Sequence, residues 1–368
     1  MINNKIVLAV LFTLVFTYND FGQNKDNAFT KSYELSGEEI FNEEFDIMLV
    51  DAIDTFIFAK LRSNDYNFRI YNSKTLNKIV NIAPIGESGN NFTNGLQYFG
   101  QYEKIHDQLY IWLCDKNRNK LYRINITKSI KDSKTCIDKE IKYLPECMFS
   151  QVYFLDSATI IGQPSNLAIK MNRFQIYNPQ LEKIVKTVSL FPKVNNDNQD
   201  LNFIFYRYNR LYNCGFMMKP DKTKFGSAMN MFNRVDIFDK DGNIKNSYID
   251  EDDIPGYIIK TYLSAKQENI KKVNVKDYYM AAFATNSFFY TLYYNQLQSD
   301  YPEKSVPVKI RIFNWNAEPV CILKVPDYLQ YFSIDEKNGI MYGVAYFDEK
   351  ILKYDISSIL DEIKTDSK

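Results

Sequence analysis

The chain has 368 residues, with 45 Lys and Arg against 45 Asp and Glu, so its formal net charge is zero. This balance argues against a nucleic-acid binder, which needs a basic excess to neutralise phosphates. The composition is that of a folded globular protein, and 28 Tyr and 27 Phe favour β-strands. A single histidine, His106, argues against metal centres that need several imidazoles.

The first segment expected along the chain is a secretory signal peptide at residues 1–22. Lys5 precedes an apolar run that ends near Phe16, and this run is shorter than the roughly 20 residues of a membrane span. No cysteine lies near the expected cleavage after Gly22, so a lipoprotein anchor is excluded. We expect residues 23–368 to be exported to the periplasm or the extracellular space, with no transmembrane segment. An uncleaved buried helix is the alternative.

The five cysteines follow no zinc or disulfide framework. Cys114 and Cys214 lie in apolar runs that are typical of buried strands. Cys136 and Cys147 lie in a loop-like stretch, and the sequence leaves open whether they form a disulfide.

A repeated pattern organises the rest of the chain: an alternating strand that ends in Asn or Asp, a short turn and a second strand. The copies end their first strands at Asn72, Asn125, Asn178, Asp239, Asn314 and Asp355. They are spaced by about 40 to 75 residues, and a pair of strands precedes each copy. The sequence therefore predicts an all-β fold, a six-bladed β-propeller of four-stranded antiparallel blades in a single domain.

The details of three blades carry further expectations. In blade 4 we expect residues 201–209 (LNFIFYRYN) to form the innermost strand. Blade 6 lacks a fourth strand because the last residues read as a polar tail, so we expect residues 28–36 to supply it and close the ring. Between blades 4 and 5, residues 251–274 contain a helical pattern behind Pro255 and form an insertion.

The C-terminal stretch resembles the TolB-like six-bladed propeller proteins of Bacteroidetes envelopes. The resemblance rests on residues 310–320 (IRIFNWNAEPV), FSIDEKNGIMYGV and ILKYDI, and it is diffuse over residues 28–356. The family motif G-x-G-P-x-E-F corresponds to residues 86–92 here, which keep Gly86 and Phe92 but lose the second Gly, the Pro and the Glu. Most of that family has no determined function, so the resemblance implies the fold and the compartment, not the chemistry.

Binding is expected on the face where the second strand of each blade turns into the third and where successive blades are joined, because the longest connections lie there. These include residues 219–230 in blade 4, 296–306 in blade 5 and the insertion. The turns on the other face read as short, among them ITKS in blade 2. The candidate binding residues on the long-loop face are Glu87, Asn90, Asn91, Asp115 and Arg118.

No nucleophile elbow, phosphate-binding loop, zinc-protease motif or dinucleotide fingerprint is present, so no catalytic residue is assigned. His106 reads as a residue of a solvated turn. Residues 239–243 (DKDGN) resemble the start of a calcium loop, but Ile244 and Asp250 stand where an EF-hand needs Gly and Glu. A hairpin turn explains this run instead. We therefore expect no metal and no cofactor, with calcium as the alternative.

Two functions remain. The preferred hypothesis is an exported monomeric scaffold that holds a protein or glycan partner at the cell envelope by its long-loop face. The alternative is a metal-dependent, lactonase-like hydrolase or lyase with its site in the central channel, with Glu87 and Asp115 as possible ligands. The fold permits this alternative, but no motif points to it.

Overall fold

The computed structural model describes residues 28–42, 44, 46–63, 65–87, 91–147, 149–164, 172–189, 207, 210–250, 256–265, 269 and 273–366. The expected signal peptide, residues 1–22, lies outside the described residues. Within them, no helix combines the length and the apolar character needed to cross a bilayer.

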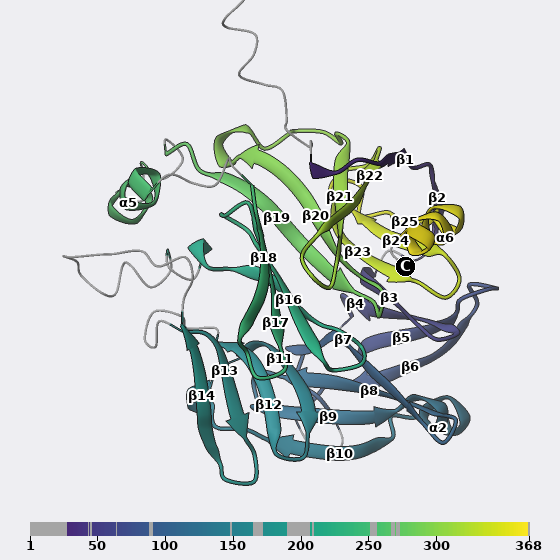
Figure 1. The fold of residues 1–368 in the computed structure, drawn as a ribbon. Coiled ribbons are helices and arrows are strands. Elements are labelled where there is room, and N and C mark those ends of the chain that lie inside the picture. Colours follow the sequence, from purple (N-terminus) through teal and green to yellow (C-terminus); the bar gives the residue numbers. More distant parts are fainter. Residues whose placement is uncertain are drawn as a thin grey trace, which may run out of the picture.

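Six sheets stand around a common axis, as the repeats predict (Figure 1). The four strands of each blade are called a, b, c and d from the axis outward, and neighbours among these four are antiparallel. Blade 1 consists of β3 (Ile47–Ile53), β4 (Phe56–Leu61), β5 (Tyr66–Asn72) and β6 (Lys78–Pro84). Blade 2 consists of β7 (Leu96–Ile105), β8 (Gln108–Asp115), β9 (Lys120–Asn125) and β10 (Ile137–Lys142). Blade 3 consists of β11 (Phe149–Asp156), β12 (Thr159–Pro164), β13 (Asn172–Asn178) and β14 (Lys183–Ser189). Blade 4 consists of β15 (Cys214–Met218), β16 (Lys224–Met229), β17 (Arg234–Asp239) and β18 (Ile244–Ile249). Blade 5 consists of β19 (Lys276–Ala284), β20 (Phe288–Leu297), β21 (Val308–Asn314) and β22 (Pro319–Val325). Blade 6 consists of β23 (Leu329–Asp335), β24 (Ile340–Ala345) and β25 (Ile351–Asp355) together with β2 (Gly37–Ile40).

An N-terminal strand closes the ring, as expected, but it lies a few residues further along the chain. β2 pairs antiparallel with β25 and supplies the fourth strand of blade 6. Part of the expected stretch, residues 28–36, instead forms β1 (Ser32–Glu34), which pairs in parallel with β22 as a fifth strand of blade 5. Figure 1 shows this purple segment against the yellow-green C-terminal sheets. The ends of the chain are thus joined by backbone hydrogen bonds.

Aromatic side chains fill the spaces between blades, which accounts for the unusual Tyr and Phe content. Trp112 of blade 2 stacks on Phe154 of blade 3 with ring centroids 4.2 Å apart, and Phe174 of blade 3 stacks on Phe216 of blade 4 at the same distance. Flat rings suit the narrow gap between two sheets because they bury much apolar area in a thin layer.

The innermost strand of blade 4 differs from the sequence expectation. It is β15, whereas most of residues 201–209 lies outside the described residues. Residues 219–223 are consequently the turn between strands a and b on the opposite face, and the stretch expected as a b-to-c loop contains β16. The small residues of β16 hide its alternation. Gly226 is required there because a Cβ would overlap the ring of Phe289 in blade 5.

Two expected loops are helices. The ITKS turn of blade 2 belongs to α2 (Ile126–Asp132), whose first turn is capped by the Asn125 side chain accepting from the Lys128 N–H at 2.8 Å. The C-terminal polar tail forms α6 (Ser357–Asp366), which buries Ile359, Leu360 and Ile363 against the core of blades 5 and 6. Its apolar residues recur at helical spacing, a signal that its polar composition masks.

Helix α5 (Gly256–Ser264) lies between β18 and β19, so the helical insertion between blades 4 and 5 is confirmed. The connections also contain two short 3₁₀ turns, η2 (Pro145–Cys147) and η4 (Gln298–Asp300). In Figure 1, α5 lies on the left, whereas α2 and α6 lie on the right. The left side is therefore the long-loop face, where the b-to-c turns and the connections between blades lie, and the right side is the opposite face.

Candidate functional site

A cavity of about 460 Å³ lies in the central channel and reaches toward the long-loop face. All six innermost strands, or the residues that lead into them, contribute to its wall. The wall residues lie mainly at the starts of the innermost strands and at the ends of strands b, which are the ends that meet the long-loop face. The cavity therefore lies toward the face that the loop lengths favour for binding.

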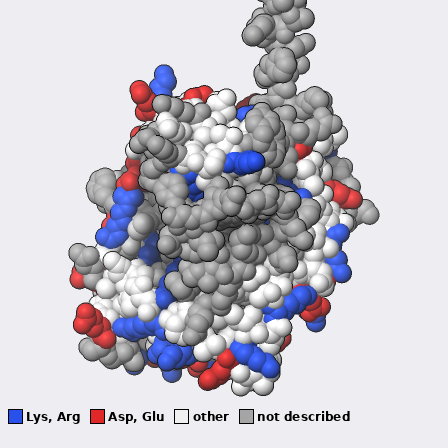
Figure 2. All heavy atoms as spheres, turned by 90° about the vertical axis from the view of Figure 1, so that its left-hand side faces the viewer, with Lys and Arg blue, Asp and Glu red and all other residues white. Residues whose placement is uncertain are grey.

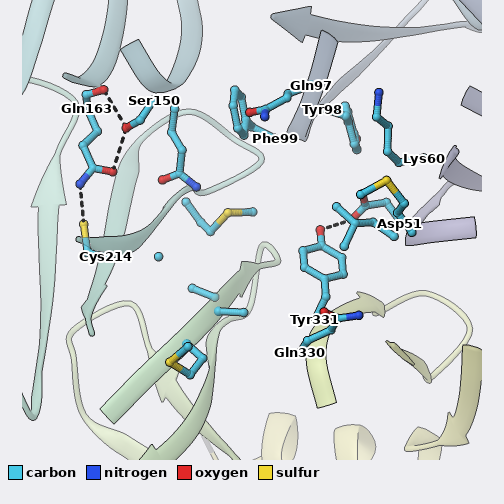
Figure 3. Close-up of a pocket in the computed structure, with 18 of the residues that line it drawn as sticks. Asp51, Lys60, Gln97, Tyr98, Phe99, Ser150, Gln163, Cys214, Gln330 and Tyr331 are labelled. Carbon is cyan, nitrogen blue, oxygen red and sulfur yellow. Dashed lines mark hydrogen bonds between the residues drawn. The ribbon is translucent and has the colours of Figure 1, made fainter. Parts of the chain in front are cut away.

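Most of the polar side chains in the cavity wall carry an amide group, and five further wall residues are aromatic (Figure 3). The amides are Gln97, Gln151, Gln163, Asn213, Asn230 and Gln330, and the aromatic residues are Phe58, Phe68, Tyr98, Phe99 and Tyr331. Neutral hydrogen-bonding groups set among apolar surfaces are typical of a pocket that orients a ligand.

On the side of blades 3 and 4, the polar groups hold one another in place. The Ser150 hydroxyl donates to the Gln163 carbonyl at 3.1 Å, and the Gln163 amide lies 3.4 Å from the Cys214 sulfur (Figure 3). Burial raises the pKa of the Cys214 thiol, so this sulfur stays protonated and is a poor nucleophile. The polar groups of this wall therefore hold fixed orientations.

On the side of blades 1 and 6, the carboxyl group of Asp51 faces the channel. Asp51 is 5% exposed, and its described hydrogen bond comes from the Tyr331 hydroxyl at 2.8 Å. Burial raises the pKa of Asp51 to about 7, although the Tyr331 hydrogen bond acts in the other direction. No Lys or Arg of the described residues forms an ion pair with it. A buried carboxylate without a cation is costly, which marks a functional candidate.

Lys60 lies on the same wall, but its amine is bonded to groups other than Asp51. Its amine donates to the Asn67 side-chain oxygen at 2.6 Å and to the Leu96 carbonyl at 3.0 Å. Burial lowers the pKa of Lys60 to about 8. Figure 3 shows the amine pointing away from Asp51. Lys60 therefore fixes the start of β7 and leaves Asp51 without a counter-ion.

A second cavity of about 430 Å³ lies toward the opposite face, and Asp51 and Tyr98 line both cavities. These two residues therefore separate the two ends of the channel. The mouth on the opposite face carries paired charges: Lys104 and Lys337 approach Asp54 at 3.5 and 3.4 Å. Asp54, Lys104 and Lys337 therefore compensate one another at this mouth.

An aromatic rim formed by Tyr294, Tyr328, Tyr346 and Phe347 lies on blades 5 and 6 at the long-loop face. Tyr346 is 54% exposed, and its ring meets that of Tyr328 edge-on at 5.8 Å. Tyr328 lies close in sequence to Gln330 and Tyr331 of the cavity wall. The rim therefore offers the exposed ring of Tyr346, supported by the buried ring of Tyr328, beside the cavity.

The sequence-predicted residues lie elsewhere, at the junction of blades 1 and 2. The Arg118 guanidinium donates to the Asn91 carbonyl at 2.6 Å and to the Gly86 carbonyl at 3.0 Å. The buried Asp115 carboxylate accepts from the Thr93 hydroxyl at 2.7 Å and also from the backbone N–H groups of Thr93 and Arg118.

The structure thus brings Asp115, Arg118 and the backbone of Asn91 together as a clasp on the connection between blades. Exposed Glu87 and Arg118 line a shallow hollow of about 420 Å³ beside the clasp. Asn90 lies outside the described residues. None of the four described candidates lines the channel cavity, and the role of all five in binding stays a prediction.

Several smaller expectations are resolved. His106 is an exposed turn residue between β7 and β8, as expected. Residues 239–243 form the hairpin turn, with Asp239 accepting from the N–H groups of Asp241 and Asn243. Cys136 and Cys147 are both free thiols. Among the described residues, no three His, Cys, Asp or Glu side chains are placed to hold a metal ion.

The long-loop face shows no patch of a single charge among its described residues. Figure 2 shows this face, on which Lys and Arg are interspersed with Asp and Glu. This pattern agrees with the zero net charge and gives no basic stripe for a phosphate backbone.

No family model and no curated protein matches the chain. Solved structures with a similar fold include a Bacteroides fragilis protein described as exported, at 12% identity and a TM-score of 0.51, covering 88% of this chain and 98% of that one. A member of the DUF4221 family from Bacteroides vulgatus has 13% identity and a TM-score of 0.53, covering 87% and 96%. At these identities the likeness shows the fold. Membership of the TolB-like family stays a prediction.

Proposed function

We propose that the protein is an exported binding scaffold that holds a partner at the cell envelope by its long-loop face. The observation that carries this proposal is the channel cavity, which lies toward that face, receives wall residues from all six blades and presents amide and aromatic side chains from five of them. The signal-like N-terminal sequence and the similar B. fragilis protein described as exported support the compartment.

The partner would engage two features. A protruding group would enter the channel cavity, and the surrounding surface would rest on the aromatic rim. Exposed Tyr rings contribute strongly to protein interfaces because they bury a large area with few rotatable bonds. The wall groups already hold fixed orientations, so binding would require little reorganisation.

A cavity-filling substitution tests this proposal. Ala281 is half-buried in the channel wall, so Ala281→Trp is expected to occupy the cavity. The matched control is Lys74→Trp, an exposed turn residue of blade 1 on the opposite face. Each protein is crosslinked to partners in intact envelopes of the source organism. We expect wild type and Lys74→Trp to capture the same partner and Ala281→Trp to lose it. Equal capture by all three proteins would contradict the proposal.

A further inference from the structure

The wall of the channel cavity offers hydrogen-bond acceptors that the protein itself does not use. Asp51 is buried and receives one described side-chain hydrogen bond, from Tyr331. Across the ring in blade 4, Asn230 is 7% exposed; its amide nitrogen contacts the Tyr279 carbonyl, whereas its side-chain oxygen has no partner among the described residues. Both residues line the same cavity. Unused buried acceptors are rare in folded proteins and indicate a missing donor.

Above about pH 7, where Asp51 is ionised, the missing donor on its side should carry a positive charge. A water molecule can satisfy an amide oxygen, but it leaves a carboxylate in a desolvated wall without charge compensation. The nearest described cation on this wall, Lys60, bonds Asn67 and Leu96 and points away from Asp51 (Figure 3). Phe58 and Tyr98 also line the cavity, and aromatic rings attract cations.

We propose that the channel cavity binds an alkylammonium group of the partner, with Asp51 as the anchoring carboxylate and Asn230 as a second acceptor on the opposite wall. This inference rests on the proposed function and names the chemistry of the inserted group. A polypeptide partner presents such a group either as a lysine side chain or as its N-terminal amine. Neutral glycans lack it.

Three probes of nearly equal size test the inference by isothermal titration calorimetry. Nα-acetyl-lysine methylamide carries the side-chain amine, norleucine methylamide carries the α-amine, and Nα-acetyl-norleucine methylamide is neutral. We expect one of the two amines to bind wild type at least tenfold more tightly than the neutral probe. The amine that is preferred identifies the source of the group.

Asp51→Asn is the decisive variant because Asn has nearly the same shape and can still accept from Tyr331. We expect this variant to lose the preference for the ammonium probe, whereas Lys74→Trp retains it. Equal binding of the amines and the neutral probe to wild type, or an unchanged preference in Asp51→Asn, would overturn the inference. The proposed function would survive either result if Ala281→Trp still lost the captured partner, so the two failures are distinguishable.

Discussion

The hydroxyl of Tyr331 on β23 donates a 2.8 Å hydrogen bond to the carboxyl group of Asp51 on β3, which joins blade 6 to blade 1. The same two strands are joined again by the Ser333 hydroxyl, which donates to the Val50 carbonyl at 2.7 Å. The junction at which the ring closes is therefore also the wall that holds the exceptional buried carboxyl. Closure of the fold and formation of the cavity depend on each other.

Asp51 should make stability depend on pH. Its pKa is about 7 in the folded protein and near the ordinary 3.8 in the unfolded chain, so the folded state retains a proton that the unfolded state has lost. The stability associated with this proton is fully present below about pH 4, is lost as pH rises to about 7 and changes little above that. Since each pKa unit is worth about 1.4 kcal/mol, the rise from 3.8 to about 7 makes the total about 4 kcal/mol.

Asp51→Asn removes this titration. We expect the free energy of unfolding of the variant, relative to wild type, to increase by about 4 kcal/mol between pH 4 and pH 8. Urea unfolding at both pH values measures the difference. A difference that does not change with pH would mean that Asp51 ionises normally in the fold.

The N-terminal strand should carry a large part of the stability. Ile40 of β2 is buried at 6% exposure against blade 6, so Ile40→Asp places a charge in the core and should cost at least about 3 kcal/mol. Exposed Glu38 on the same strand pairs with Lys353, and Glu38→Ala should cost less than about 1 kcal/mol. Chemical unfolding compares the two. Equal stabilities would show that β2 is not needed to close the ring.

The clasp between blades 1 and 2 should be structural and independent of calcium. Asp115 is buried and its oxygens already accept from Thr93 and Arg118, so Asp115→Ala should cost about 2–4 kcal/mol. Glu87 is exposed, and Glu87→Ala should have little effect. Thermal unfolding with EDTA and then with added calcium measures both. A rise in melting temperature with calcium that Asp115→Ala abolishes would instead support the metal-dependent alternative.

The aromatic rim should contribute to affinity more than to stability. Tyr346 is 54% exposed, so Tyr346→Ala should weaken binding of the captured partner at least tenfold and change the free energy of unfolding by less than about 1 kcal/mol. Leu181, 59% exposed on the opposite face, provides the control Leu181→Ala. Surface plasmon resonance compares the three proteins. Similar losses in both variants would exclude a specific role for the rim.

The sequence was sufficient to predict the blades but not the site. Alternation revealed most strands, and the missing fourth strand of blade 6 indicated closure by the N-terminus. The strand prediction for blade 4 was wrong because Gly226, Ser227 and Ala228 show no apolar alternation. Gly226 is required by the ring of Phe289, which belongs to another blade. Such a constraint between blades leaves no local pattern.

The cavity was missed for a related reason. Asp51 stands inside the apolar strand IMLVDAI, and Gln97 and Gln330 begin other strands, so each resembles an ordinary polar strand residue. Only the ring geometry brings the six innermost strands together. Asp115 and Arg118 were both proposed as binding candidates on the long-loop face, and the structure joins them through the Arg118 backbone N–H, which donates to the Asp115 carboxylate. A polar residue in the middle of an innermost strand is the signal that could have found Asp51.

The central claim is that the channel cavity on the long-loop face receives a group of the partner. Met48, Met217 and Met280 line the cavity, whereas Met231 and Met341 are buried elsewhere. The most direct measurement is a methyl NMR titration of ¹³C-methionine-labelled protein with the captured partner. We predict shifts in the signals of Met48, Met217 and Met280, with those of Met231 and Met341 unchanged. Saturation with the partner while the three cavity signals stay in place would contradict the claim.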